Sequence, residues 1–253
     1  MMDEWAVMIE REEMVEELRV KVFRFNPDSD IAPGFDNFQF PSFENMSILD
    51  VVMHIQNYLD KSLSFRFSCR VGMCGSCAMY INGRPRLACR TQVSSLRTQK
   101  ITLMPLPNFP IIRDLVMDME PFFEKWKRIK PYYVPQKEIA EPAIVPPGAK
   151  EREFIDDMLD CITCGACYSA CSMVATNEEF LGPAILNRAY TLIADKRDAI
   201  RVERLKVVDR SFGVWRCHTQ FNCAEVCPKN IVPTKSIQNL KRRCVLSKFG
   251  FHR

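Results

Sequence analysis

The 253-residue chain lacks the long apolar segments of a membrane protein. No run of residues approaches the roughly 18 consecutive apolar positions that a transmembrane helix needs, so we expect no membrane span. The first residues, MMDEWAVMIEREEMVEE, are acidic and have no apolar centre, so we expect no secretory signal. Both absences favour a protein of the cytoplasmic side, unless a partner subunit holds it at a membrane.

Nucleotide-binding loops are also missing. The sequence contains no GxGxxG segment or other phosphate-binding loop, so we expect no nucleotide cofactor on this chain. Its three histidines, His54, His218 and His252, stand far apart in sequence, and His54 falls within a helical pattern that favours a structural role. Nothing in the chain supplies a two-electron reaction centre of its own.

Acidic residues are absent from one end of the sequence. Residues 229–253 contain seven Lys or Arg and no Asp or Glu, so the rest of the chain is net acidic although the whole carries +4. Such a basic segment binds anionic lipid or nucleic acid in some proteins and is a solvated helix face in others. Charge alone favours the solvated face.

The hydrophobic pattern predicts an α+β protein. Residues 18–25 alternate as a half-buried strand does, residues 38–40, 78–83 and 100–106 are typical of further strands, and Ser47 is the expected N-cap of a helix over 48–59. We place the end of this first domain at 108. Residues 109–150 are expected to hold a helix over 114–128, broken by Pro121, and a proline-rich linker; residues 151–253 are mostly helical, with helices near 151–160, 182–195 and 232–246.

Cysteine is abundant, with twelve residues. Without a secretory signal, disulfides explain them poorly, and metal binding or redox chemistry explains them better. The segment SCRVGMCGSCAMYINGRPRLAC follows the C-x4-C-x2-C…C spacing of plant-type [2Fe–2S] sites. Gly72 and Gly75 permit the tight loop that such a cluster needs and leave amides free to point at sulfur. The alternative is a four-cysteine zinc site. The expected ligands are Cys69, Cys74, Cys77 and Cys89.

Two further cysteine runs lie in the second half. CITCGACYSAC matches the bacterial ferredoxin run C-x2-C-x2-C-x3-C, and CHTQFNCAEVCP repeats it with Gln220 in place of one cysteine. In two-cluster ferredoxins the fourth cysteine of each run ligates the other cluster. Applied here, the rule gives one [4Fe–4S] cluster four thiolates and leaves three for the other. The two sets are Cys161, Cys164, Cys167 and Cys227, and Cys171, Cys217 and Cys223.

Three thiolates suit a [3Fe–4S] cluster, because a neutral amide at Gln220 is a poor ligand for iron that prefers thiolate. The alternative is a [4Fe–4S] cluster whose fourth iron takes water or the glutamine oxygen. Cys244 is left over and is expected to be a packed thiol. Three clusters on one chain make an electron relay between partners that carry out the chemistry. A zinc scaffold that binds nucleic acid through the basic end fits these spacings far less well, so we expect no nucleic-acid partner.

These motifs, in order, resemble the iron–sulfur subunit of succinate dehydrogenase and fumarate reductase over residues 18–243. The resemblance implies a plant-ferredoxin-like β-grasp domain followed by a helical bacterial-ferredoxin-like domain. It implies a flavoprotein partner with FAD, a membrane anchor with haem b, and a position on the cytoplasmic face of the inner membrane. It also implies a quinone site near the [3Fe–4S] cluster, with His218, Gln220 and Lys241 close to it.

One departure bears on the quinone. Many succinate:ubiquinone members carry tryptophan just after the cysteine equivalent to Cys171, whereas this chain reads SMVATNEEFLGPAILNR there. The segment is more similar to fumarate reductases that use menaquinol, so we expect menaquinone. Related complexes, of the methylmenaquinol type or similar to heterodisulfide reductase, remain the alternative, and identifying the large partner separates them.

Overall fold

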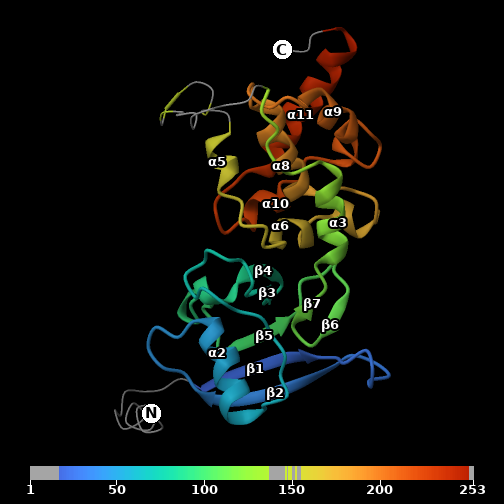
Figure 1. Ribbon diagram of the computed structural model, residues 1–253. Coiled ribbons are helices and arrows are strands. Elements are labelled where there is room, and N and C mark those ends of the chain that lie inside the picture. The colour runs from blue at the N-terminus through green and yellow to red at the C-terminus, as the bar shows by residue number, and fades with distance from the viewer. Residues whose placement is uncertain (1–16, 137–145, 147, 150–151, 153–154, 251–253) are drawn as a thin grey trace.

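The computed structural model of the protein describes residues 17–136, 146, 148–149, 152 and 155–250. Figure 1 shows a sheet-containing part that holds the start of the chain and a helical part that holds its end. The expectations for residues 1–16 and for most of the proline-rich linker lie outside the described residues.

A five-stranded sheet forms the first part, in the order β2-β1-β5-β3-β4. The central pair β1·β5 is parallel and the other pairs are antiparallel, which is the expected β-grasp arrangement. The alternation in the first strand puts Leu18, Val20 and Val22 into the core and leaves Glu17, Arg19 and Lys21 exposed, and Phe23 near the end of the strand is buried as well. The strands are β1 (Glu17–Arg24), β2 (Gly34–Pro41), β3 (Ala78–Ile81), β4 (Arg84–Leu87) and β5 (Lys100–Met104).

The predicted helix is α2 (Ile48–His54), which continues as a π-helical turn over Ile55–Leu59. Ser47 is its N-cap: the Ser47 hydroxyl accepts the backbone N–H of Asp50, and the Asp50 carboxylate accepts the backbone N–H of Ser47. The apolar side chains of α2 are buried on one face. Short 3-10 turns over Ala88–Arg90 and Ser94–Leu96 complete this part of the chain.

The connection to the helical part differs from the prediction. Residues 111–117 form a small antiparallel pair, β6 (Ile111–Arg113) and β7 (Val116–Met117), and the helix α3 is confined to Glu120–Arg128. Pro121 does not break this helix but lies in its first turn, where the missing N–H leaves no hydrogen bond unmade. The expected helix over 114–128 was therefore wrong in its first six residues.

The helical part is built around α8 (Pro183–Ala194), whose residues are buried on nearly every side, and α11 (Pro233–Lys248), which packs against it. Both match predicted helices, whereas α9 (Arg201–Val208) was not predicted because charged residues interrupt its apolar pattern. The two cysteine runs lie in and beside short helical turns, which are α5 (Asp156–Leu159), α6 (Ala166–Ser169), α7 (Ser172–Ala175), η5 (Val214–Arg216) and α10 (Asn222–Glu225).

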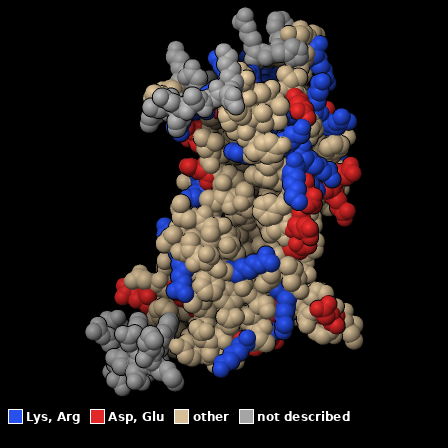
Figure 2. Space-filling view, viewed as in Figure 1, with Lys and Arg blue, Asp and Glu red and all other residues tan. Residues whose placement is uncertain are grey.

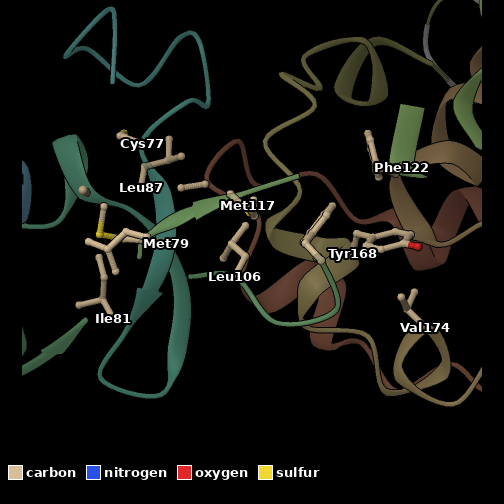
Figure 3. Close-up of a cluster of buried hydrophobic side chains, with 14 of the residues drawn as sticks. Cys77, Met79, Ile81, Leu87, Leu106, Met117, Phe122, Tyr168 and Val174 are labelled. Carbon is tan, nitrogen blue, oxygen red and sulfur yellow. The ribbon is translucent and has the colours of Figure 1, made fainter. Parts of the chain in front are cut away.

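One hydrophobic core crosses from the sheet to the helices (Figure 3). Phe109, Phe122 and Tyr168 meet at its centre, with ring centroids of Phe109 and Phe122 lying 5.1 and 5.3 Å from that of Tyr168. The amide of Asn108 donates to the carbonyl of Ser169 at 2.8 Å at the same boundary. The two parts are therefore packed together and not merely tethered.

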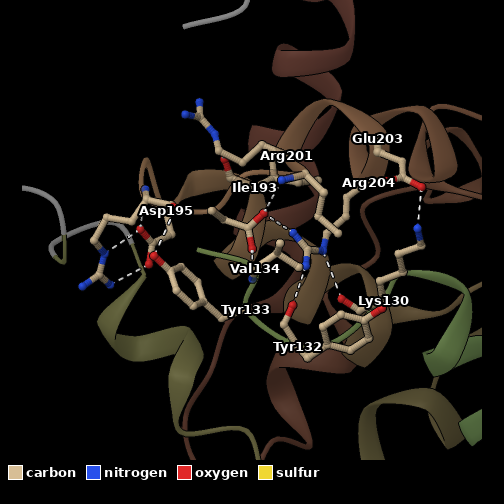
Figure 4. A network of polar contacts seen from close by, with 12 residues as sticks. Lys130, Tyr132, Tyr133, Val134, Ile193, Asp195, Arg201, Glu203 and Arg204 are labelled. Carbon is tan, nitrogen blue, oxygen red and sulfur yellow. Dashed lines mark hydrogen bonds and ion pairs between the residues drawn. The ribbon is translucent and has the colours of Figure 1, made fainter. Parts of the chain in front are cut away.

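A buried polar network fixes the segment that leaves α3 (Figure 4). Arg204 on α9 is 1% exposed and pairs with Asp198, which is equally buried. Its guanidinium also donates to the carbonyls of Ile129 and Lys130, both at 3.1 Å, and to that of Tyr132. One buried arginine thus satisfies three backbone acceptors and one carboxylate.

The surface over α3 and α9 carries charges of both signs (Figure 2). Exposed ion pairs there include Lys127 with Glu124 and Lys130 with Glu203. In the part of the chain that the structure describes, no helix has both the length and the apolar character to span a bilayer.

Candidate iron–sulfur sites

The loop before β3 presents backbone amides to a cysteine sulfur. The N–H groups of Met73 and Cys74 donate to Sγ of Cys69 at 3.2 and 3.3 Å. Together with the N–H of Val71, the largest contribution, they lower the pKa of the Cys69 thiol to about 6. Amides that stabilise a thiolate also stabilise an iron–thiolate centre, so this loop fits the expected cluster.

The other cysteines of the first set approach from the sheet. The N–H of Ala88 donates to the carbonyl of Cys77 at 3.0 Å, which brings the turn that holds Cys89 against the end of β3. Burial raises the pKa of Cys77 to about 12, with the nearby thiols of Cys89 and Cys74 adding to the effect. The set therefore has a buried half, Cys77 and Cys89, and an outer half, where Cys74 is exposed.

Two glycines are required in this loop. Gly75 has φ +75°, and a Cβ there would lie 2.7 Å from Cβ of Cys164 and 3.2 Å from the carbonyl oxygen of Ile162. Gly72 has φ +72°, and a Cβ there would lie 2.8 Å from Cγ of Arg90. The first cysteine loop is consequently in direct contact with the second, through Gly75.

The second set combines residues from both cysteine runs of the helical part. Burial raises the pKa of Cys164 to about 11, and the thiols of Cys161 and Cys227 lie close enough to contribute. Burial also raises the pKa of Cys167 strongly, and this thiol interacts with Cys164, Cys161 and Cys227. Cys227 thus joins the first run despite its distance in sequence, because α10 packs against α6.

The third set lies beside it. Burial raises the pKa values of Cys171 and Cys223, and each of these thiols interacts with Cys217. All three line one pocket together with His218 and Gln220. Cys167 interacts with Cys223 as well, so the second and third sets are neighbours.

Polar side chains surround the third set in a way that spacing could not reveal. The Ser172 hydroxyl donates to Oε1 of Gln220, and Sγ of Cys223 lies 3.3 Å from the hydroxyl of Thr234. Nζ of Lys241 donates to the carbonyl of Cys217 at 2.8 Å, so this predicted residue reaches the third set, and His218 and Gln220, which are exposed, line the same pocket as its thiols. Ser172 and Thr234 carry no sequence signal, since their partners are set by the tertiary fold.

The sulfur donors are of the kind that iron–sulfur clusters use. Each set consists of thiols alone, the preferred ligands of such clusters, and the first also receives backbone amides. Among the described residues, no three His, Cys, Asp or Glu side chains are close enough together to hold a single metal ion. The remaining thiol, Cys244, is fully buried on α11, and burial raises its pKa to about 12.

Known proteins match both halves of the chain. Residues 19–124 match the 2Fe–2S iron–sulfur cluster binding domain family, and residues 157–231 match the 4Fe–4S dicluster domain family. The fumarate reductase iron–sulfur subunit of Haemophilus influenzae is 36% identical over 236 residues, covering 88% of this chain and 91% of the relative.

Two further proteins indicate the same family. The fumarate reductase iron–sulfur subunit of Escherichia coli O6:H1 is 38% identical over 224 residues, with the same coverage of both chains. A chain of the Mycobacterium smegmatis Sdh1 complex, solved in the apo form, superposes with a TM-score of 0.83 at 29% identity, covering 93% of this chain and 98% of that one. This protein therefore belongs to the family of iron–sulfur subunits of fumarate reductase and succinate dehydrogenase.

Proposed function

We propose that the chain relays single electrons between the FAD of a flavoprotein subunit and a quinone held by a membrane anchor. The observation that carries this proposal is the continuous series of thiol sets. The first set touches the second through Gly75 and Cys164, and the second meets the third through Cys167 and Cys223. The assignment is [2Fe–2S], [4Fe–4S] and [3Fe–4S], in that order, with the ligands predicted from the sequence.

Iron–sulfur clusters supply one-electron redox chemistry when bound. The chain's own part is to hold the thiolates, to bury them and to orient dipoles toward them. The amides aimed at Cys69 would stabilise the more negative, reduced state of a neighbouring centre, and they need not reorient when an electron arrives, so the loop is preorganised for electron transfer. Burial of Cys77, Cys164 and Cys167 keeps water from the thiols that face the protein interior.

The two ends of the series differ in their surroundings. At the first set, Val71 and Met73 are each 61% exposed and form an apolar rim suited to a flavoprotein surface. At the other end, α11 exposes Val245 and Leu246, and Phe249 just beyond it is 74% exposed, beside basic residues. We assign this end to the membrane anchor, which would hold haem b and keep the subunit on the cytoplasmic face of the membrane.

The quinone end includes His218, Gln220 and Lys241. Lys241 is tied to the carbonyl of Cys217, which keeps a positive charge beside the third set, where an electron leaves or enters. In the oxidative direction succinate loses two electrons and two protons to become fumarate, and the quinone gains both; fumarate reduction is the reverse. Menaquinone is favoured because the segment after Cys171 carries Ala175 and Thr176 and no tryptophan.

The third set provides the sharpest test. The oxidised, fully metallated protein should show the electron paramagnetic resonance signal of a three-iron centre, and Gln220→Cys should admit a fourth iron and lower its potential. An unchanged signal in Gln220→Cys would refute the ligand position of Gln220 and with it the three-iron assignment.

The whole relay is tested in the assembled complex, which should oxidise succinate and reduce fumarate with menaquinone analogues faster than with ubiquinone analogues. The reverse preference would refute the menaquinone assignment. Co-purification with a large subunit other than a succinate- or fumarate-active flavoprotein would favour the related complexes, of the methylmenaquinol or heterodisulfide-reductase-like type.

A further inference from the structure

We propose that a pocket between the sheet and the helical part binds a small anion that carries two or more carboxylate or phosphate groups. The pocket has a volume of about 550 Å³, within the range of roughly 300–1,000 Å³ that is typical of small-molecule sites. Arg84, Arg86 and Arg90 line it from β4 and the following turn, and Lys229 lines it from the loop after α10.

Positive charge in this pocket exceeds negative charge. Glu225 is the one acidic residue among those that line it, and its carboxylate lies 3.6 Å from Nη2 of Arg84, with both side chains more than half exposed. Such a pair is weak in water. Within the described part of the chain, Arg86 and Arg90 make no ion pair, and the polar contact of Lys229 is to Sδ of Met73 at 3.7 Å. Three cationic groups therefore share one space without a carboxylate of their own.

The arrangement of these cations selects a multivalent ligand. They come from two parts of the chain that face each other, so an anion with two charged groups can contact both sides, whereas a monovalent ion would leave one side unneutralised. Guanidinium groups match the paired oxygens of carboxylate and phosphate, which favours these groups over a spherical anion such as chloride. Bound anion would also relieve the repulsion among the cations.

The pocket adjoins two thiol sets. Arg90 follows Cys89 directly, and Cys227 of the second set lines the pocket itself. An anion bound here would disfavour the addition of an electron at either set, so it should lower both reduction potentials. By linkage, reduction should weaken anion binding by the same factor. Only this redox consequence depends on the proposed function, because the binding itself needs no electron transfer.

Binding is tested on the full chain with its iron and sulfide in place, using pyrophosphate and citrate as probes in isothermal titration calorimetry. We expect saturable binding with about one site per chain. Arg86→Gln should weaken it by about tenfold or more, since each charge-assisted contact is worth at least that factor. Arg19→Gln, an exposed substitution on β1 outside the pocket, should leave binding unchanged. Glu225→Gln should strengthen it, because a competing carboxylate is removed.

Absence of saturable binding by both probes, or equal weakening by Arg86→Gln and Arg19→Gln, would overturn the proposal. Preference for pyrophosphate identifies a phosphate ligand, and preference for citrate a carboxylate ligand. Arg90→Gln repeats the test if Arg86→Gln loses iron. The complex with its partner subunits must retain the binding; loss there would show that a partner's surface fills the pocket, and the small-anion proposal would fail.

The redox arm uses the same samples. Electron paramagnetic resonance titrations with and without pyrophosphate should show that pyrophosphate lowers the reduction potentials of the first two centres. The potential of the third centre should not change. Unchanged potentials alongside normal binding would refute the coupling of the site to the thiol sets, while leaving the relay itself untouched.

Discussion

Replacing Arg204 with methionine should release the segment that joins the sheet to the helices. The change removes the partner of the buried Asp198 and the donor to three backbone carbonyls. Breaking a buried ion pair from one side costs about 3–5 kcal/mol. Asp198 keeps the N–H groups of Val134 and Ile200, at 3.2 and 3.0 Å, which places the expected loss near the lower end, at about 3 kcal/mol.

Native-state hydrogen exchange measures this loss locally and does not require two-state unfolding of a chain with bound clusters. The amides to follow are those of Val134 and Ala199; the latter donates to the carbonyl of Val134 at 2.8 Å. A loss of about 3 kcal/mol should speed their exchange by about 150-fold. Amides of β1 in the distant sheet should be unaffected.

Glu203→Gln is the matched control, because it breaks an exposed ion pair of the same helix, with Lys130. An exposed pair contributes about 0–1 kcal/mol, so exchange should change by no more than about fivefold. Comparable acceleration in Arg204→Met and Glu203→Gln would refute the view that burial makes the Arg204 network decisive.

Three further changes probe the first part of the chain. Gly75→Ala should lower the [2Fe–2S] content, measured by iron and sulfide analysis, whereas Gly83→Ala, also at positive φ but with open space around it, should retain the cluster; equal losses would exclude the clash as the cause. Ser47→Ala should lower the local stability of α2 by about 1 kcal/mol through loss of the capping box, measured by native-state hydrogen exchange of its amides, and unchanged exchange would mean that the cap contributes nothing to stability. Hydrogen bonds from Ser62 hold the pKa of Asp60 at about 2, below its usual 3.8, so its contribution to stability is present above about pH 4 and is lost as pH falls through about 2. The stability difference between wild type and Asp60→Asn should shrink over that range, and a difference constant with pH would contradict the assignment.

The sequence was informative where a local rule decides the structure. Alternation predicted β1, and Ser47 predicted the start of α2, because a strand face and an N-cap depend on neighbours within a few residues. Pro121 misled for a related reason: proline is compatible with the first helical turn and incompatible with the middle, and pattern alone did not tell which applied. The helix α9 was missed because its apolar residues are few and its anchor, Arg204, is charged.

Cysteine spacing assigns the thiols to three sets, since a loop that supplies several ligands to one cluster must keep them within a few residues of each other. Spacing also assigned Cys227 to the set of Cys161, and these thiols do interact. Cysteine spacing could not predict which polar side chains surround the thiols. Thr234 beside Cys223 and Ser172 beside Gln220 owe their positions to α11 and α7, and any small polar residue would have fitted the sequence pattern equally well.

In the proposed relay the centres must keep their separations, and three separate features of the structure act on them. Gly75 against Cys164 fixes the contact between the first two cysteine loops. The aromatic cluster around Tyr168 packs the two parts of the chain together just beside the second set. The Arg204 network holds the connecting segment from the far side of the helical part. Because these features are a hydrophobic cluster, a backbone contact and a buried ion pair, a substitution that removes only the ion pair leaves the other two in place. The Arg204→Met variant should therefore open locally while its centres still exchange electrons, whereas Gly75→Ala acts on the relay directly.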